Sequence, residues 1–184
     1  MKLVMVDFDG TLFDTKDVNY QAYNNAMRKY GYYMDYEYYC KFCNGRHYMD
    51  FLPQITTSDM AITSEIHKVK QEVYAEYLLY AKCNESLVEL LKIIKRECKV
   101  ALVTTASKKN VVELLDKFCL RELFDFIVTQ EDVIMKKPDP EAYLVAMKYF
   151  DVTAQDCIIF EDSSIGIEAA ERAGVTCYVV RGYN

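Results

Sequence analysis

The amino-acid sequence predicts an α/β fold, in which a five-stranded parallel sheet is flanked by helices and a small all-helical domain is inserted after the first strand. Three observations support this prediction. Short apolar runs alternate with helical patterns near the N-terminus and from residue 98 onward. Residues 15–82, in contrast, contain no convincing strand and hold most of the tyrosines. Acidic, hydroxyl and lysine side chains follow several of the apolar runs, at the edge where parallel sheets bind ligands.

The expected strands are the apolar runs 3–6, 100–103, 126–128, 157–160 and 177–180. Helical patterns lie between them, over Lys108–Phe118, Pro140–Phe150 and Ile165–Ala173. Strands that alternate with helices favour a parallel sheet, because parallel neighbours need a crossover connection.

The inserted segment is expected to be helical. Within it, Asp59–Tyr80 is predicted to form one long helix, because apolar and aromatic side chains recur there at a spacing of three or four. A return helix over Leu87–Arg96 then leads into the second strand. We therefore expect an α/β core domain of residues 1–14 and 83–184, and a helical cap domain of residues 15–82.

Length and charge exclude several classes of protein. The 184 residues suffice for one domain with a modest insertion. The formal charge of −6 argues against nucleic acid or an anionic membrane as the main partner. No apolar run approaches the ~18 residues of a membrane span, and Asp7 comes too early for a signal peptide. We expect a cytoplasmic protein whose oligomeric state is open, with a monomer favoured.

Seven cysteines without a framework spacing indicate reduced thiols. Cys40 and Cys43, with His47 four residues further on, could begin a zinc site. No fourth ligand is evident nearby, so buried thiols on a helical segment are the favoured interpretation.

Chemistry-bearing side chains follow four of the five expected strands. They are Asp7 and Asp9 after the first, Thr104 and Thr105 after the second, Lys137 beyond the third, and Glu161 and Asp162 after the fourth. Each group alone has an ordinary structural explanation: a turn, a strand end, a solvated loop charge or a helix cap. Their shared position beyond parallel strands predicts instead that they converge at one edge of the sheet.

Such a convergence suits phosphoryl transfer. Clustered carboxylates repel one another unless a divalent cation joins them, and Mg²⁺ prefers oxygen ligands. A carboxylate can act as a nucleophile, and a second carboxyl group can donate and later accept a proton. A lysine and a hydroxyl can hold phosphate oxygens. Gly10 allows a tight turn whose backbone N–H groups face an anion.

At these residues the sequence resembles the haloacid dehalogenase superfamily, in the branch of phosphoglycolate phosphatases and β-phosphoglucomutase. "VDFDGTLFDT" resembles its first motif, "LVTTAS" its second, "KKPDPEAY" its third and "IIFEDSSIGIEAAERAG" its fourth. The resemblance covers the whole chain. It implies a Rossmann-like core with a helical cap, and an Mg²⁺-dependent hydrolase that acts on a small phosphorylated metabolite.

The resemblance also implies roles for individual residues. Asp7 would be the nucleophile and Asp9 the general acid and base. Thr104 and Lys137 would bind the phosphoryl group, with Thr105 beside them. The implied metal ligands are Asp7, the Asp9 backbone carbonyl and Asp162, with Glu161 nearby. The residue before the motif lysine is usually small in the family, whereas Lys136 occupies that position here.

The segment "FCNGRHYMDFL", residues 42–52, resembles the family's substrate-specificity loop. β-Phosphoglucomutase-like proteins tend to carry Lys just before its glycine and Arg three residues after it. This chain has Asn44 and Tyr48 at those positions, which weakens the mutase interpretation. Arg46 and His47 are the expected substrate contacts, although a solvated helix start explains them equally well.

The sequence therefore predicts a phosphatase that forms an aspartyl-phosphate. A sugar-phosphate mutase of the same chemistry is the first alternative. A phosphate-binding or regulatory protein without turnover is the second, and the intact set of Asp7, Asp9, Lys137 and Asp162 argues against it.

Overall fold

The computed structural model describes residues 2–182. The chain divides into two compact units, which are considered separately below. The first comprises Met1–Asp14 and Cys83–Asn184 and is termed the α/β unit. The second comprises Thr15–Lys82 and is termed the helical unit. Strands β2 (Phe13–Asp14) and β3 (Lys82–Cys83) pair where the chain passes from one unit to the other.

The α/β unit is built on a five-stranded sheet in the order β5-β4-β1-β6-β7, with every pair of neighbours parallel. Its strands are β1 (Leu3–Val6), β4 (Lys99–Val103), β5 (Phe126–Val128), β6 (Cys157–Glu161) and β7 (Thr176–Val179). The four residues of the central strand β1 are completely buried, as expected of a strand covered on both faces. The predicted α/β, Rossmann-like fold is confirmed.

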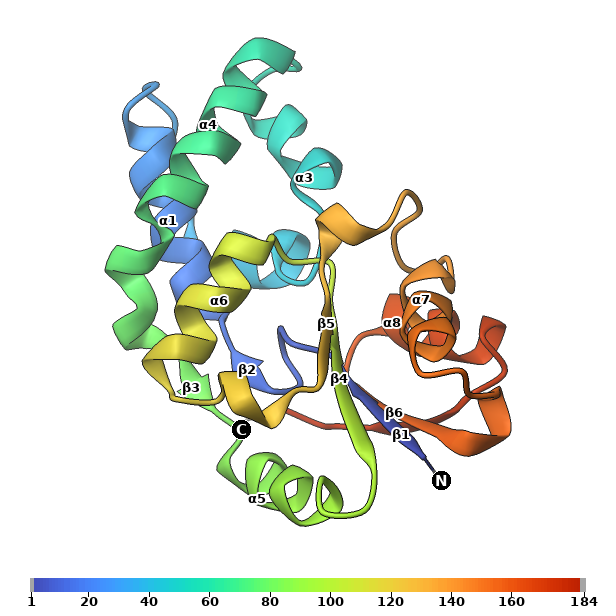
Figure 1. The fold of residues 1–184 in the computed structure, drawn as a ribbon. Coiled ribbons are helices and arrows are strands. Elements are labelled where there is room, and N and C mark those ends of the chain that lie inside the picture. The colour runs from blue at the N-terminus through green and yellow to red at the C-terminus, as the bar shows by residue number, and fades with distance from the viewer. Residues whose placement is uncertain (1, 183–184) are drawn as a thin grey trace. The chain divides into compact units, whose positions relative to one another are not determined.

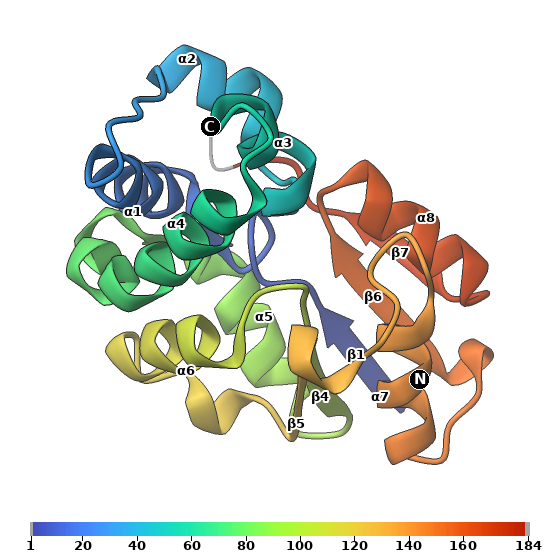
Figure 2. The ribbon, with the colours of Figure 1, turned by 90° about the horizontal axis from the view of Figure 1, so that it is seen from above.

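Four helices flank this sheet: α5 (Glu85–Ile94), α6 (Lys108–Lys117), α7 (Glu141–Tyr149) and α8 (Ser164–Arg172). Figures 1 and 2 show α5 and α6 on one face of the sheet and α7 and α8 on the other. Short 3₁₀ turns occupy Arg121–Leu123, Gln130–Asp132 and Ala154–Asp156. The core on the α7 and α8 side includes the fully buried Tyr143 and the strand residues Leu3 and Met5.

The register of the sheet brings three strand ends together. Val6, the last residue of β1, lies opposite Leu102 of β4 and Phe160 of β6. Asp7, Val103 and Glu161 each come one residue later. Because the strands are parallel, these three positions lie side by side at the carboxyl edge of the sheet.

The helical unit consists of α1 (Lys16–Arg28), α2 (Tyr36–Tyr38), α3 (Tyr48–Ile55) and α4 (Met60–Val73), with a π-helical turn over Tyr39–Cys43 and a 3₁₀ segment over Tyr74–Tyr80. Its core is sulfur-rich and aromatic: Tyr23, Tyr39 and Phe51 are buried with Met27 and Met34. Some of its tyrosines therefore serve in packing, whereas others, such as Tyr33 and Tyr80, are exposed.

The long helix predicted over Asp59–Tyr80 is wrong in its last third, over Tyr74–Tyr80. Helix α4 ends at Val73, and the chain continues as a 3₁₀ segment. Apolar spacing does not separate the two forms, because residues three apart share a face in both. The prediction was correct at the start, where the Asp59 side chain accepts hydrogen bonds from the N–H groups of Ala61 and Ile62.

The cysteines within residues 2–182 form no disulfide bond. Cys43 is buried and donates to the sulfur of Met34 at 3.6 Å, so it contributes to the core of the helical unit. Within residues 2–182, no helix is long and apolar enough to cross a membrane.

Candidate active site

The centre of the candidate site is the buried ammonium group of Lys137. Its Nζ donates to Asp7 Oδ1 at 2.6 Å and to Glu161 Oε1 at 2.8 Å. A third hydrogen bond, of 3.2 Å, reaches the backbone carbonyl of Val103. The lysine therefore joins the ends of β1, β4 and β6, which lie far apart in the sequence. Its neighbour Lys136 is exposed.

Asp162 lies against the loop that follows β1. Its Oδ1 accepts a hydrogen bond of 2.8 Å from the Thr11 hydroxyl. A Cβ atom at Gly10 would lie 2.1 Å from Asp162 Oδ2, and Gly10 has a φ of +91°. Both the backbone conformation and the space taken by the carboxylate require glycine at position 10.

Glu161 is hydrogen-bonded through both carboxylate oxygens. Oε2 accepts from the Asp162 N–H at 2.7 Å and from Ser163 at 2.8 Å (N–H) and 3.1 Å (hydroxyl). Oε1 accepts from Lys137. A Cβ at Gly166 would lie 1.6 Å from Oε1, so this glycine makes room for the carboxylate. Glu161 thus shapes the loop after β6 and holds Lys137.

The site gathers three acidic side chains beside one lysine. Carboxylate oxygens of Asp7, Glu161 and Asp162 lie within 4.8 Å of one another, beside the single ammonium of Lys137. Burial raises the pKa of Asp162 to about 6, although the hydrogen bond from Thr11 opposes this shift. Burial alone would lower the pKa of Lys137, but the adjacent Asp7, Tyr143 and Glu161 together outweigh it and raise the lysine pKa.

This donor set fits a hard divalent cation such as Mg²⁺. The available groups are carboxylate oxygens, and the excess negative charge calls for a cation. Asp7 and Asp162 fit best as ligands, because the oxygens of Glu161 are already engaged by N–H and O–H donors.

The other predicted residues of the α/β unit lie at the same edge. Asp9 is partly buried, and its charge raises the pKa of Asp162, which places the two carboxylates near each other. Thr104 is buried directly after β4, and its hydroxyl accepts from the Ala106 N–H at 3.0 Å. Thr105 follows it and is half-buried.

The two predicted substrate contacts lie in the helical unit. Arg46 is exposed just before α3. His47 is half-buried at the start of that helix, where its Nδ1 accepts from the Met49 N–H at 3.4 Å. His47 thus caps the start of α3, which agrees with the helix-start interpretation that the sequence offered as an alternative to a substrate contact.

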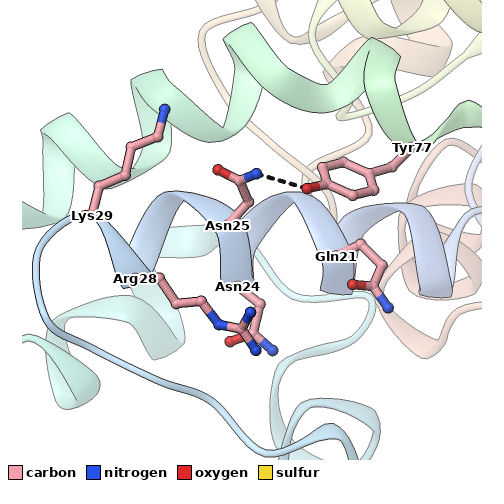
Figure 3. Close-up of a pocket in the computed structure, with 6 residues that line it drawn as sticks. All are labelled: Gln21, Asn24, Asn25, Arg28, Lys29 and Tyr77. Atoms are coloured by element: carbon pink, nitrogen blue, oxygen red, sulfur yellow. Dashed lines mark hydrogen bonds between the residues drawn. The ribbon is translucent and has the colours of Figure 1, made fainter.

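The helical unit also has an open hollow of about 370 Å³, shown in Figure 3. Its lining residues are Gln21, Asn24, Asn25, Arg28, Lys29 and Tyr77. The Asn25 amide donates to the Tyr77 hydroxyl at 2.7 Å, and Arg28 and Lys29 point to opposite sides of α1. The two cations do not converge on one ligand position, and none of the predicted site residues lines this hollow.

Sequence reasoning missed three participants at the sheet edge: the Val103 carbonyl, Gly166 and Tyr143. The Tyr143 ring lies under Lys137 Nζ, 4.9 Å from it. Tyr143 lies six residues after the lysine, within α7, and the sequence pattern gives it no role. The backbone carbonyl carries no signal in a sequence.

Comparison with known proteins gives the family. The model of the haloacid dehalogenase-like hydrolase family matches residues 4–180, so this chain belongs to that family, as its motifs predicted. A curated relative, the phosphorylated carbohydrates phosphatase of Thermotoga maritima, is 32% identical over 181 residues, which cover 95% of this chain and 82% of the relative.

Solved structures agree with this assignment. The crystal structure of CbbY from Rhodobacter sphaeroides in complex with phosphate is 27% identical with a TM-score of 0.88, and the match covers 100% of this chain and 87% of that one. β-Phosphoglucomutase from Clostridium difficile is 25% identical with a TM-score of 0.81, and covers 100% of this chain and 86% of that one.

Proposed function

We propose that this protein is an Mg²⁺-dependent phosphatase that hydrolyses small phosphate monoesters through an aspartyl-phosphate on Asp7. The observation that carries the proposal is the buried contact of Lys137 with both Asp7 and Glu161, beside Asp162. This arrangement supports Asp7 as the nucleophile, because a cation that can offset phosphate charge contacts its carboxylate. The phosphatase relative from Thermotoga maritima supports the substrate class.

In the first half-reaction, a carboxylate oxygen of Asp7 forms a bond to phosphorus while the bond from phosphorus to the ester oxygen breaks. Asp9 donates a proton to the departing oxygen, so the alcohol leaves neutral. In the second, Asp9 takes a proton from a water molecule whose oxygen attacks the same phosphorus. Inorganic phosphate is released and the Asp7 carboxylate is restored.

Lys137 and the polar groups around it bind and orient the phosphoryl group. The ammonium offsets negative charge on the transferring oxygens, and we assign Thr104 and Thr105 as further phosphate-binding groups at the end of β4. Asp7, Asp162 and the backbone carbonyl of Asp9 would hold the magnesium ion, with Glu161 supporting Asp162. When bound, Mg²⁺ supplies additional charge neutralisation for the phosphate.

We assign the helical unit as the cap that selects the substrate, with Arg46 and His47 as its candidate contacts. The insertion of this unit eight residues after Asp7, between the first two strands of the five-stranded sheet, supports the assignment. Cap domains of this kind exclude water and complete the site around a bound substrate.

A sugar-phosphate mutase is the second candidate, because a β-phosphoglucomutase is among the matching structures. One contact argues against it. The ring of Tyr48, at a position where mutase-like relatives tend to carry Arg, stacks on His67 with centroids 3.7 Å apart. Tyr48 thus packs within the helical unit, and this position offers no cation to a second phosphate.

A panel of phosphorylated metabolites, assayed for free phosphate with and without Mg²⁺, tests the proposal. We expect magnesium-dependent phosphate release, abolished in Asp7→Asn and retained in Asp116→Asn, which alters an exposed aspartate of α6. Conversion of a sugar phosphate into its isomer with little phosphate release would support the mutase instead. Full activity of Asp7→Asn would contradict both candidates.

A further inference from the structure

The ammonium group of Lys137 contacts an aromatic ring in addition to its three hydrogen-bond acceptors. An ammonium has three N–H donors, and Asp7, Glu161 and the Val103 carbonyl accept all three. The face of the Tyr143 ring lies against the same nitrogen, with its centroid 4.9 Å away. Tyr143 itself is completely buried in α7.

The tyrosine offers two contacts to this network, and they differ in quality. Its hydroxyl donates to Glu161 Oε1 at 3.5 Å, which is long for an O–H···O hydrogen bond. The ring face, in contrast, lies within the ~6 Å over which a ring quadrupole attracts a cation, and burial strengthens that attraction. The ring therefore contributes more to the position of Lys137 than the hydroxyl does.

We propose that Tyr143 is a positioning residue, whose ring face holds the Lys137 ammonium at the phosphoryl site through a cation–π contact. This proposal rests on the proposed function, in which Lys137 binds the phosphoryl group. The contact gains importance during turnover, because Asp7 loses its full carboxylate charge once it carries phosphate. Lys137 then keeps Glu161, the Val103 carbonyl and the ring as its remaining partners.

Tyr143 also fills space in the core around α7, beside Ala146 and Met147. A packing role depends on the shape of the ring, whereas a cation–π contact depends on its electrons. The test therefore changes the electrons and keeps the shape.

The experiment compares Tyr143, Tyr143→Phe, a 3,4,5-trifluorophenylalanine at position 143, and Tyr143→Leu. The same fluorinated residue at Tyr149, an exposed position of α7, is the matched control. We expect kcat to be nearly retained in Tyr143→Phe and to fall about tenfold in the fluorinated and Leu variants, with KM changed less than about twofold. The Tyr149 control should retain kcat, and all aromatic variants should keep the same Tm.

Equal kcat values for the Phe and trifluorophenylalanine variants would overturn the proposal and leave packing as the role of Tyr143. A loss in Tyr143→Phe as large as in Tyr143→Leu would overturn it in favour of the hydroxyl. Wild-type protein without phosphatase activity would instead count against the proposed function, and the geometry can then be tested without turnover.

Nuclear magnetic resonance of the metal-free protein provides that separate test. A ring face over the ammonium shifts the Hε protons of Lys137 upfield through the ring current. We expect this shift in wild-type protein and Tyr143→Phe, and its loss in Tyr143→Leu. Unshifted Hε resonances in the wild-type protein would overturn the proposal independently of any activity.

Discussion

Among residues 2–182, each unit buries one lysine, and different side chains contact the two. Lys137 of the α/β unit contacts two carboxylates. Lys70 of the helical unit lies against the rings of Tyr23 and Tyr74, with centroids 5.1 and 4.6 Å away. Burial of a charge alone therefore does not identify a candidate catalytic group. Lys137 is a candidate because its two carboxylate partners, Asp7 and Glu161, lie where three strand ends meet.

Lys137→Met is expected to have the largest effect on stability and activity. The substitution leaves Asp7, Glu161 and Asp162 without their internal cation, so the metal-free protein should lose about 3–5 kcal/mol of unfolding free energy. Loss of charge stabilisation at the phosphoryl group should lower kcat/KM by about 10²–10³-fold. Urea unfolding and phosphate-release assays measure the two effects.

Lys136→Met is the matched control, because Lys136 is the adjacent lysine and is exposed. It should change stability by less than about 0.5 kcal/mol. Equal effects of the two substitutions would mean that the contacts of Lys137 do not define the site.

Gly166→Ala should give the next largest effect. Alanine normally stabilises a helix relative to glycine, by up to about 1 kcal/mol. Here the new Cβ would overlap Glu161 Oε1, so the carboxylate must move away from Lys137. We expect a loss of about 1–3 kcal/mol and a reduced kcat. Ser164→Ala, at an exposed position of the same helix, is the control, and stabilisation by Gly166→Ala would contradict the tight fit.

A change of pH is expected to have a smaller effect on the stability of the metal-free protein. The pKa of Asp162 is raised to about 6 in the folded protein, whereas an unfolded aspartate ionises near pH 4. Between about pH 4 and pH 6 the folded state therefore binds more protons, so this group makes the metal-free protein less stable as pH rises. Asp162→Asn should remove this pH-dependent loss of stability, which is measured by urea unfolding in the presence of EDTA at several pH values. An unchanged pH profile would exclude Asp162 as its source.

The smallest effect is expected in the helical unit, from Arg46→Ala. Arg46 is exposed, so unfolding free energy should change by less than about 0.5 kcal/mol. If Arg46 contacts the substrate, KM should rise several-fold while kcat stays within about twofold. His47→Ala should also cost less than about 1 kcal/mol, because its capping contact is long at 3.4 Å. Unchanged KM in both variants would remove them as substrate contacts.

The two units also differ in how much of each the sequence predicts. In the α/β unit, each apolar run ends at a polar residue, and parallel pairing then places Asp7 and Glu161 next to each other. Lys137 follows β5 by nine residues, yet the same topology brings it back to the edge. In the helical unit, spacing of three or four residues fits both α and 3₁₀ helices, so the end of α4 at Val73 was not predicted.

Other features of the site depend on packing that no pattern encodes. Gly166 is explained by the carboxylate of Glu161, a contact that appears only once α8 is placed against β6. The contact of Tyr143 with Lys137, which lies in the loop before α7, likewise appears only in the folded chain. The oxygens of Glu161 accept hydrogen bonds from N–H and O–H donors. The sequence alone does not distinguish a glutamate in this role from one that binds a metal ion.

Trapping the covalent intermediate tests the central claim most directly. Protein mixed with a turned-over substrate and Mg²⁺ is quenched in acid, reduced with borohydride and digested, and the peptides are analysed by mass spectrometry. Borohydride reduces an aspartyl-phosphate to homoserine, so homoserine is expected at position 7. Homoserine at another aspartate, or turnover with Asp7 unmodified at every quench time, would contradict it.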